Sequence, residues 1–203
     1  MAGQTGIMDI RDGWRMTSEN GGMKLGALPQ LPDELMEFAA AWQNWRGDGL
    51  PPDRGQVSLG DISLLLPRVM VLEVLSPTEA PFRLVGTSYR ETFGIELTGL
   101  NFVDLATPGN RAVRGHRLWT RANTPCGSHA SSPDLNPSRA GNLIHTLSFP
   151  VRPKHPNQPM QFFGLSFGTR KVDLSVSYGI DMVERLADNF SYIDIGAGLP
   201  NQT

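Results

Sequence analysis

The alternation of apolar and polar side chains is the clearest pattern in the chain, and it predicts β-strands. Residues 142–151 alternate two sets of side chains: Leu143, His145, Leu147 and Phe149 against Ile144, Thr146 and Ser148. Residues 69–75 form an apolar run of strand length, and residues 82–85 and 160–167 have a strand-like composition. The polar segment 128–138 fits a weak strand or a loop.

Four other segments have the spacing of helices. Residues 33–46 follow the potential N-cap Asp33 and end before two glycines and two prolines. Their apolar side chains repeat at helical spacing along one face: Leu35, Phe38, Ala39, Trp42 and Trp45. Shorter helices are predicted at 87–93 and 180–190, and a long one at 110–122, which Pro125 and Gly127 follow.

These elements divide the chain into three regions. Residues 1–30 show no sustained period, so we expect a flexible N-terminal arm. Residues 31–170 contain the tryptophan-bearing helix and all the predicted strands, and we expect them to form one domain. Residues 171–203 are predicted to be a polar linker, a C-terminal helix and a glycine-rich tail.

One stretch allows a family assignment. Residues 81–105 read PFRLVGTSYRETFGIELTGLNFVDL, in which a strand runs directly into short helices separated by Gly94 and Gly99. The pattern resembles the strand-to-helix crossover of PAS sensory domains, and in particular that of standalone bacterial PAS proteins of about this length. A second match to those proteins precedes it: Trp45, Leu50, Pro51, Arg54, Ile62, Leu65, Leu66 and Pro67.

The resemblance implies an α+β fold with a five-stranded antiparallel sheet, short helices on one face, and flanking N- and C-terminal helices. It also implies a sensory or regulatory role in bacterial signalling, exerted through a ligand or a protein partner. No cofactor motif of the better-known PAS domains is present in this sequence, so the cofactor is unknown.

Composition limits the possible binding partners and cellular location of the protein. The formal net charge is −2, and the basic residues form no extended cluster, which argues against binding to nucleic acid or to an anionic membrane. No apolar run is long enough to span a bilayer, and the N-terminus lacks a signal-peptide core. The single cysteine, Cys126, excludes an internal disulfide. We therefore expect a soluble cytoplasmic protein.

The sequence carries no recognisable catalytic motif. It lacks GxSxG, Walker, HExxH and CxxC patterns, and its four histidines have no metal-ligand spacing. We therefore expect that the protein is not an enzyme and holds no metal; a small enzyme is the less favoured alternative.

Two residues merit testing as cofactor ligands. Haem-binding PAS domains carry their axial histidine on the long middle helix, where His116 lies in this chain; the alternative is a surface histidine. Cys126 follows that helix and lacks the Asn-Cys-Arg motif of flavin-binding relatives, which disfavours flavin photochemistry.

A small ligand in an apolar pocket is a further hypothesis, with a filled core as its alternative. The candidate pocket residues are Val85, Tyr89, Phe93, Phe102, His116, Leu118, Leu147 and Phe163. Four arginines, at 111, 114, 117 and 121, share one helix face. We interpret them mainly as a solvated face, and alternatively as a site for an anionic ligand or an acidic partner.

The helix at 33–46 supplies the candidate interaction surface. Phe38, Trp42 and Trp45 are the expected anchors for a signalling partner or for a homodimer, because buried aromatics carry much of the binding energy of an interface. The alternative is that this helix covers the domain's own sheet.

Overall fold

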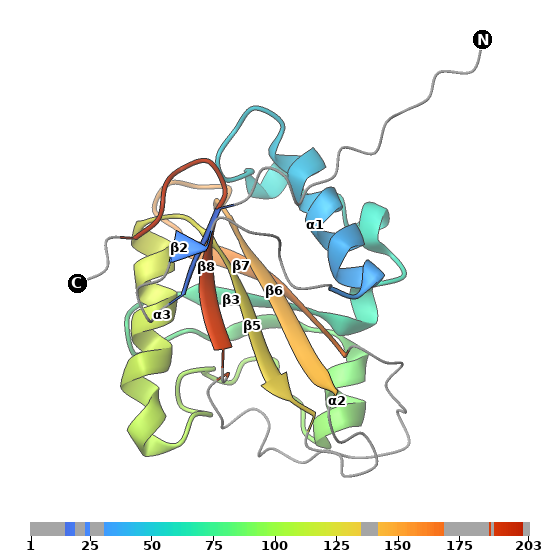
Figure 1. Ribbon diagram of the computed structural model, residues 1–203, viewed down its shortest axis with the longest axis vertical. Helices are drawn as coiled ribbons and strands as arrows, with labels where there is room; N and C mark the ends of the chain where they lie inside the picture. Colours follow the sequence, from blue (N-terminus) through green and yellow to red (C-terminus); the bar gives the residue numbers. More distant parts are fainter. Residues whose placement is uncertain are drawn as a thin grey trace.

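The computed structural model describes residues 15–18, 23–24, 31–134, 142–168, 187 and 189–200 (Figure 1). It is an α+β structure in which one antiparallel sheet of eight strands has the order β2-β1-β8-β5-β6-β7-β3-β4. The strands are β1 Arg15–Ser18, β2 Met23–Lys24, β3 Val69–Val74, β4 Phe82–Val85, β5 Gly127–Pro133, β6 Leu143–Val151, β7 Met160–Gly168 and β8 Asn189–Asp194.

The described residues form three α-helices beside the sheet: α1 Asp33–Arg46, α2 Thr87–Phe93 and α3 Arg111–Asn123. Four short 3-10 helices connect these elements: η2 Arg54–Gln56, η3 Leu59–Ile62, η4 Leu66–Arg68 and η5 Pro108–Asn110. None of the helices in the described part of the chain is long and apolar enough to cross a bilayer.

The five strands expected from the resemblance are present and adjacent to one another. They are β3 to β7, and they lie in the order β5-β6-β7-β3-β4. Strand β3 pairs with both β4 and β7, so the first and last of the five in chain order are neighbours in the sheet. The α+β prediction with its antiparallel sheet is therefore confirmed.

Three further strands extend the sheet beyond β5, and the sequence analysis missed them. Strand β8 pairs with β5 and also with β1, which in turn pairs with β2. Residues 1–30 are thus not an arm wholly without structure, and the sheet continues past residue 170. The predicted helix at 180–190 falls mostly outside the described residues, but its end, from Asn189, belongs to strand β8. The sequence offers little indication of these strands, because β1 and β2 have only four and two residues and β8 lacks a clear alternation of apolar and polar side chains.

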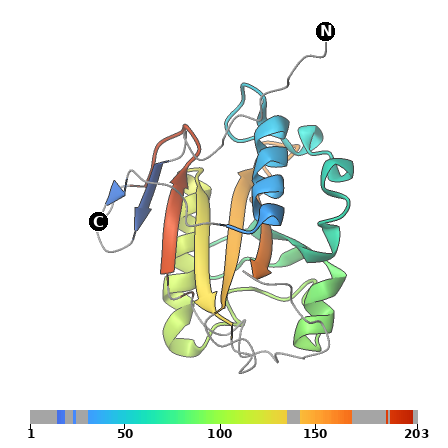
Figure 2. The ribbon, with the colours of Figure 1, turned by 45° about the vertical axis from the view of Figure 1, so that its right-hand side comes forward.

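Helix α1 covers one face of the sheet, on which it packs against β6 and β7 (Figure 2). The core on this face includes Leu35, Phe38 and Trp42 of the helix and Phe149 and Phe163 of the strands. The Trp42 indole stacks on Phe149 with ring centroids 4.9 Å apart, and its Nε1 donates to the Pro150 carbonyl at 2.9 Å. The flanking N-terminal helix is therefore part of the domain's own core.

Helices α2 and α3 lie against the opposite face. The alternation of β3 separates the two cores: Val69 and Val71 point toward α1, whereas Met70 and Leu72 belong to the second core. This second core also includes Phe82 of β4, Phe162 of β7, Leu118 of α3, and partly buried Tyr89 and Phe93 of α2. The helices of the crossover and the long middle helix thus share one face, as expected.

Asn101 fixes the chain between α2 and α3. Its Oδ1 accepts hydrogen bonds from the backbone N–H groups of Ala80 and Val103, at 2.8 and 3.2 Å. Its Nδ2 donates to the Thr78 carbonyl and to the Asp104 carboxylate. One side chain therefore ties this segment to the turn between β3 and β4, which holds the neighbouring Phe102 against the sheet.

Candidate functional site

A cavity of about 250 Å³ lies between the sheet and the helices α2 and α3. One part of its wall is apolar and aromatic and includes Leu72, Phe82, Tyr89, Phe93, Phe102 and Leu118. The other part is polar and carries three arginines of α3 with hydroxyl groups of the strands: Arg114, Arg117, Arg121, Ser128, Thr146 and Ser148. The cavity is therefore amphipathic.

Arg121 is the most buried charged residue on the polar wall, with 4% of its surface exposed. Its Nη2 donates to the carbonyl and the hydroxyl oxygen of Ser148, at 3.0 Å each, and its Nε donates to the Cys126 carbonyl at 3.4 Å. The guanidinium lies 4.1 Å from the centre of the Phe162 ring. Burial lowers the pKa of Arg121 to about 10, which leaves it charged at neutral pH.

The partners of Arg121 are neutral. It takes part in none of the ion pairs found among the described residues, which join Arg83 to Glu73, Arg111 to Asp104 and Arg152 to Asp53. A buried charge ordinarily lies beside an opposite charge, because leaving water costs several kcal/mol that neutral hydrogen bonds only partly offset. Arg121 thus places an electropositive patch on the cavity wall.

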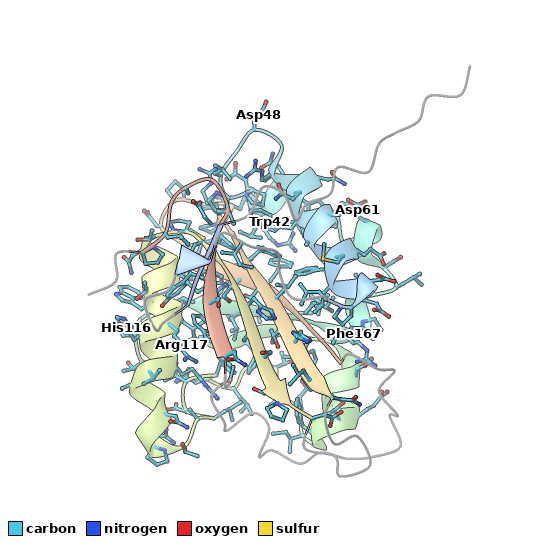
Figure 3. All side chains as sticks on the ribbon, in the orientation of Figure 1. Trp42, Asp48, Asp61, His116, Arg117 and Phe167 are labelled. Atoms are coloured by element: carbon cyan, nitrogen blue, oxygen red, sulfur yellow. The ribbon has the colours of Figure 1, made fainter. Side chains whose placement is uncertain are left out.

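Arg114 lies about two helical turns from Arg121 on α3 and is 5% exposed. Its Nη1 donates to the Phe102 carbonyl at 2.9 Å, and its guanidinium lies 4.3 Å from the Phe102 ring centre. Burial, and then the nearby Arg117, lower its pKa to about 10. Arg117 itself stacks on Phe190 of β8 at 4.3 Å and lies on the side of α3 that faces the strands (Figure 3).

Tyr89 adds a polar group at the apolar end of the cavity. Its hydroxyl is buried and makes no hydrogen bond of normal geometry within the described part of the chain. Burial raises its pKa, and interactions with Ser166 and Arg68 act in the opposite direction. A ligand atom in this corner would therefore have a phenol within reach.

The predicted pocket residues divide into two groups. Tyr89, Phe93, Phe102 and Leu118 line the cavity, whereas Val85 packs at the edge of the same core without reaching it. Leu147 and Phe163 do not line it, because both face α1 on the other side of the sheet. The lining residues of β6 are their neighbours Ile144, Thr146 and Ser148. Our prediction combined strand residues from both faces of the sheet: Val85 belongs to the cavity-side core, whereas Leu147 and Phe163 face α1.

His116 is not a cavity residue, which overturns the prediction of it as a haem ligand. It lies on the outer side of α3, exposed, with Nε2 3.5 Å from the Thr120 hydroxyl (Figure 3). The residues of α3 that face inward are Arg114, Gly115, Leu118 and Arg121. Helical spacing puts His116 on a different face from these four, so its imidazole cannot reach a ligand bound inside.

The arginines are the site residues that sequence reasoning misjudged. We interpreted their face as solvated, but Arg114 and Arg121 are buried, with backbone carbonyls as hydrogen-bond acceptors. A signal was available: Leu118 and Gly115 fall on the same face as the arginines, and the outer face carries Val113 and Trp119. The helix therefore buries two of its four arginines and exposes two large apolar side chains.

The expected interaction anchors on α1 are buried as well. Phe38 and Trp42 are 0% exposed and Trp45 is 4% exposed, within the domain's own core. The Trp45 Nε1 donates to Asp61 at 2.9 Å, and its ring meets Phe163 edge-on. These three side chains lie out of a partner's reach, and the alternative that α1 covers its own sheet is correct.

A histidine pair occupies the other face of the sheet, away from the cavity. His129 Nε2 and His145 Nδ1 are 3.0 Å apart and the rings are stacked. Burial lowers the pKa of both, that of His129 to about 4 with a contribution from His145. No group of three metal-ligating side chains occurs among the described residues.

Comparison with known proteins assigns the family. The model of the PAS domain family matches residues 32–137, just over half of the chain, from α1 through β5. No curated protein matches the sequence. The matched segment contains the crossover helices and α3, which line the cavity. The five adjacent antiparallel strands β3 to β7 agree with the sheet that the resemblance implies. This chain therefore belongs to the PAS domain family.

Proposed function

We propose that this PAS protein binds a small molecule in the cavity between α3 and the sheet and signals its presence through protein contacts. The sensory or regulatory role follows from the family. The observation that carries the ligand proposal is the buried charge of Arg121 on the cavity wall, with neutral partners only in the described part of the chain.

The size of the cavity supports occupancy by a ligand. Protein interiors are close-packed, and voids larger than a water molecule are few. A volume of 250 Å³ equals about eight waters at their share of roughly 30 Å³ each in the liquid. Apolar walls with a few converging polar groups are the usual features of a small-molecule site.

A binding role fits the lining better than a catalytic one. The described residues that line the cavity include no histidine, carboxylate or cysteine. Proton transfer in enzymes is carried out most often by these groups, with pKa values near the working pH. The guanidinium and hydroxyl groups present are suited to holding a ligand.

Helix α3 connects the cavity to the surface. Its inner face holds Arg121 and Leu118, whereas Val113 and Trp119 of its outer face are 41% and 37% exposed. We propose that the outer face contacts a signalling protein or a second copy of the chain. Replacing Trp119 with Glu is then expected to weaken self-association in sedimentation velocity, or capture of an identified partner.

Protein NMR on the full chain tests the ligand proposal. We expect neutral and anionic fragments to shift amide signals of cavity residues such as Ser128 and Thr146. Ala130→Leu places three extra carbons into the cavity wall and should abolish those shifts. Ala112→Leu, on the exposed surface of α3, is the matched control and should leave them unchanged. Fragments that shift no cavity signal at millimolar concentration, or that bind Ala130→Leu equally well, would refute the proposal.

A further inference from the structure

We propose that the ligand of this cavity is a small organic carboxylate, with its carboxylate group on Arg121 and its apolar body against the aromatic wall. The inference rests on the function proposed above and names the class of molecule that the cavity accepts. Arg121, the opposite apolar wall and the small volume between them support it.

The charge of Arg121 requires compensation. Arg121 is 4% exposed, and its guanidinium, hydrogen-bonded among the described residues only to carbonyls and a hydroxyl, retains its full positive charge. Burial disfavours this charged form, as the lowered pKa shows. An anionic ligand supplies the opposite charge in a low-dielectric site, where the attraction is much stronger than in water.

The geometry leaves one end of the guanidinium for that ligand. Nε and Nη2 are engaged by Cys126 and Ser148, whereas Nη1 makes no hydrogen bond to the described residues. Stacking on Phe162 and the three donated bonds fix the plane of the group. A guanidinium held in this way is preorganised for an anion, so little side-chain entropy is lost on binding.

The rest of the cavity selects for the body of the ligand. Phe82, Phe93, Phe102 and Leu118 provide apolar surface, and Phe102 and Phe162 are already stacked against arginines. A volume of 250 Å³ lies below the usual range of about 300–1,000 Å³ for drug-sized ligands. The match is therefore a single ring or a short aliphatic chain that bears one carboxylate.

Strand hydroxyls complete the recognition of an acid. Ser128, Thr146 and Ser148 line the same polar wall, and hydroxyl groups donate hydrogen bonds to carboxylate oxygens. Inorganic phosphate would satisfy the charge but would leave the aromatic wall empty. An organic carboxylate satisfies both parts of the cavity.

Benzoate and benzamide separate charge from shape in calorimetric titrations of the full chain. The two probes share a ring and a planar head group, but only benzoate is charged. We expect benzoate to bind at least tenfold more tightly than benzamide or inorganic phosphate, since a hydrogen bond to a charged group is worth about 1.5–3 kcal/mol, or roughly ten- to 150-fold. Equal binding of benzoate and benzamide, or tighter binding of phosphate, would overturn the assignment.

Substitutions of Arg121 test whether the carboxylate binds to this residue. Arg121→Gln should weaken benzoate at least tenfold while changing benzamide by less than threefold, and Arg121→Lys should retain part of the benzoate affinity. Arg90→Gln, which removes an exposed arginine on α2, is the control and should bind like wild type. If Arg121→Gln does not fold, the Arg121 Nε–Hε NMR signal of wild type replaces it. That signal should shift with benzoate and not with benzamide, and a signal that ignores benzoate would overturn the assignment.

The same titrations distinguish this inference from the broader one. If benzamide and benzoate bind equally well in the cavity, the proposal of a ligand-binding protein stands and the proposal that its ligand is a carboxylate is refuted. If neither benzoate, benzamide nor any fragment shifts the NMR signals of Ser128 and Thr146, both the carboxylate proposal and the broader ligand proposal are refuted.

Discussion

Arg121 of helix α3 donates two hydrogen bonds to Ser148 of strand β6, one to the carbonyl oxygen and one to the hydroxyl oxygen, each 3.0 Å long. This contact joins the long helix to the centre of the sheet through a group that also lines the cavity. A change that weakens it therefore affects both the stability of the domain and the position of α3.

Arg121→Lys should lower the free energy of unfolding by about 1–3 kcal/mol, because an ammonium group cannot reproduce the hydrogen bonds that the planar guanidinium donates to Ser148 and Cys126. Urea denaturation at pH 7 measures this change. Arg90→Lys, at an exposed position, should alter stability by less than about 0.5 kcal/mol. Equal stabilities of the two variants would show that the Arg121 contacts contribute little.

Trp42→Ala should destabilise the domain by about 3–5 kcal/mol, since it empties a fully buried site and leaves the Pro150 carbonyl without its donor. Trp119→Ala should cost much less, because Trp119 is 37% exposed. Thermal and urea unfolding of both variants provide the comparison. Similar losses for the two tryptophans would contradict the placement of α1 in the core.

Gly115→Ala should destabilise the protein by about 1–3 kcal/mol, although alanine normally favours a helix over glycine by about 1 kcal/mol. A Cβ at this position would lie 1.8 Å from the Pro77 carbonyl oxygen, so α3 or the turn must move. Gly109→Ala meets no atom within 4 Å and is the control. A stabilised Gly115→Ala protein would show that the helix does not pack so closely on this turn.

Acid should destabilise the protein through the histidine pair. Burial lowers the pKa of His129 from 6.5 to about 4, so between these values the unfolded chain binds a proton that the folded chain does not. The free energy of unfolding should therefore fall as the pH drops from about 6.5 to about 4, by on the order of 3 kcal/mol for this group. Urea titrations at several pH values measure the slope.

His129→Gln should flatten that slope, whereas His155→Gln, at an exposed position, should preserve it. A slope that is unchanged in His129→Gln would assign the acid sensitivity to other groups.

The sequence alone predicted the elements whose side chains have a clear period. The alternation in residues 142–151 located β6, and the spacing of Phe38, Trp42 and Trp45 located α1. Glycines at 86 and 94 bounded α2, as expected from capping and from positive φ, which is 73° at Gly94. Local rules suffice for such elements because the period of a strand or helix is an intrinsic property of its backbone.

The sheet-wide pairings and the site required the tertiary structure. Strand parity decided that Thr146 and Ser148 line the cavity while Leu147 faces α1, and no local signal tells which face of β6 meets which helix. The burial of Arg114 and Arg121 likewise depended on where α3 lies against β6 and Phe102. Spacing placed these arginines on one face of α3, but only packing determined that this face closes a cavity.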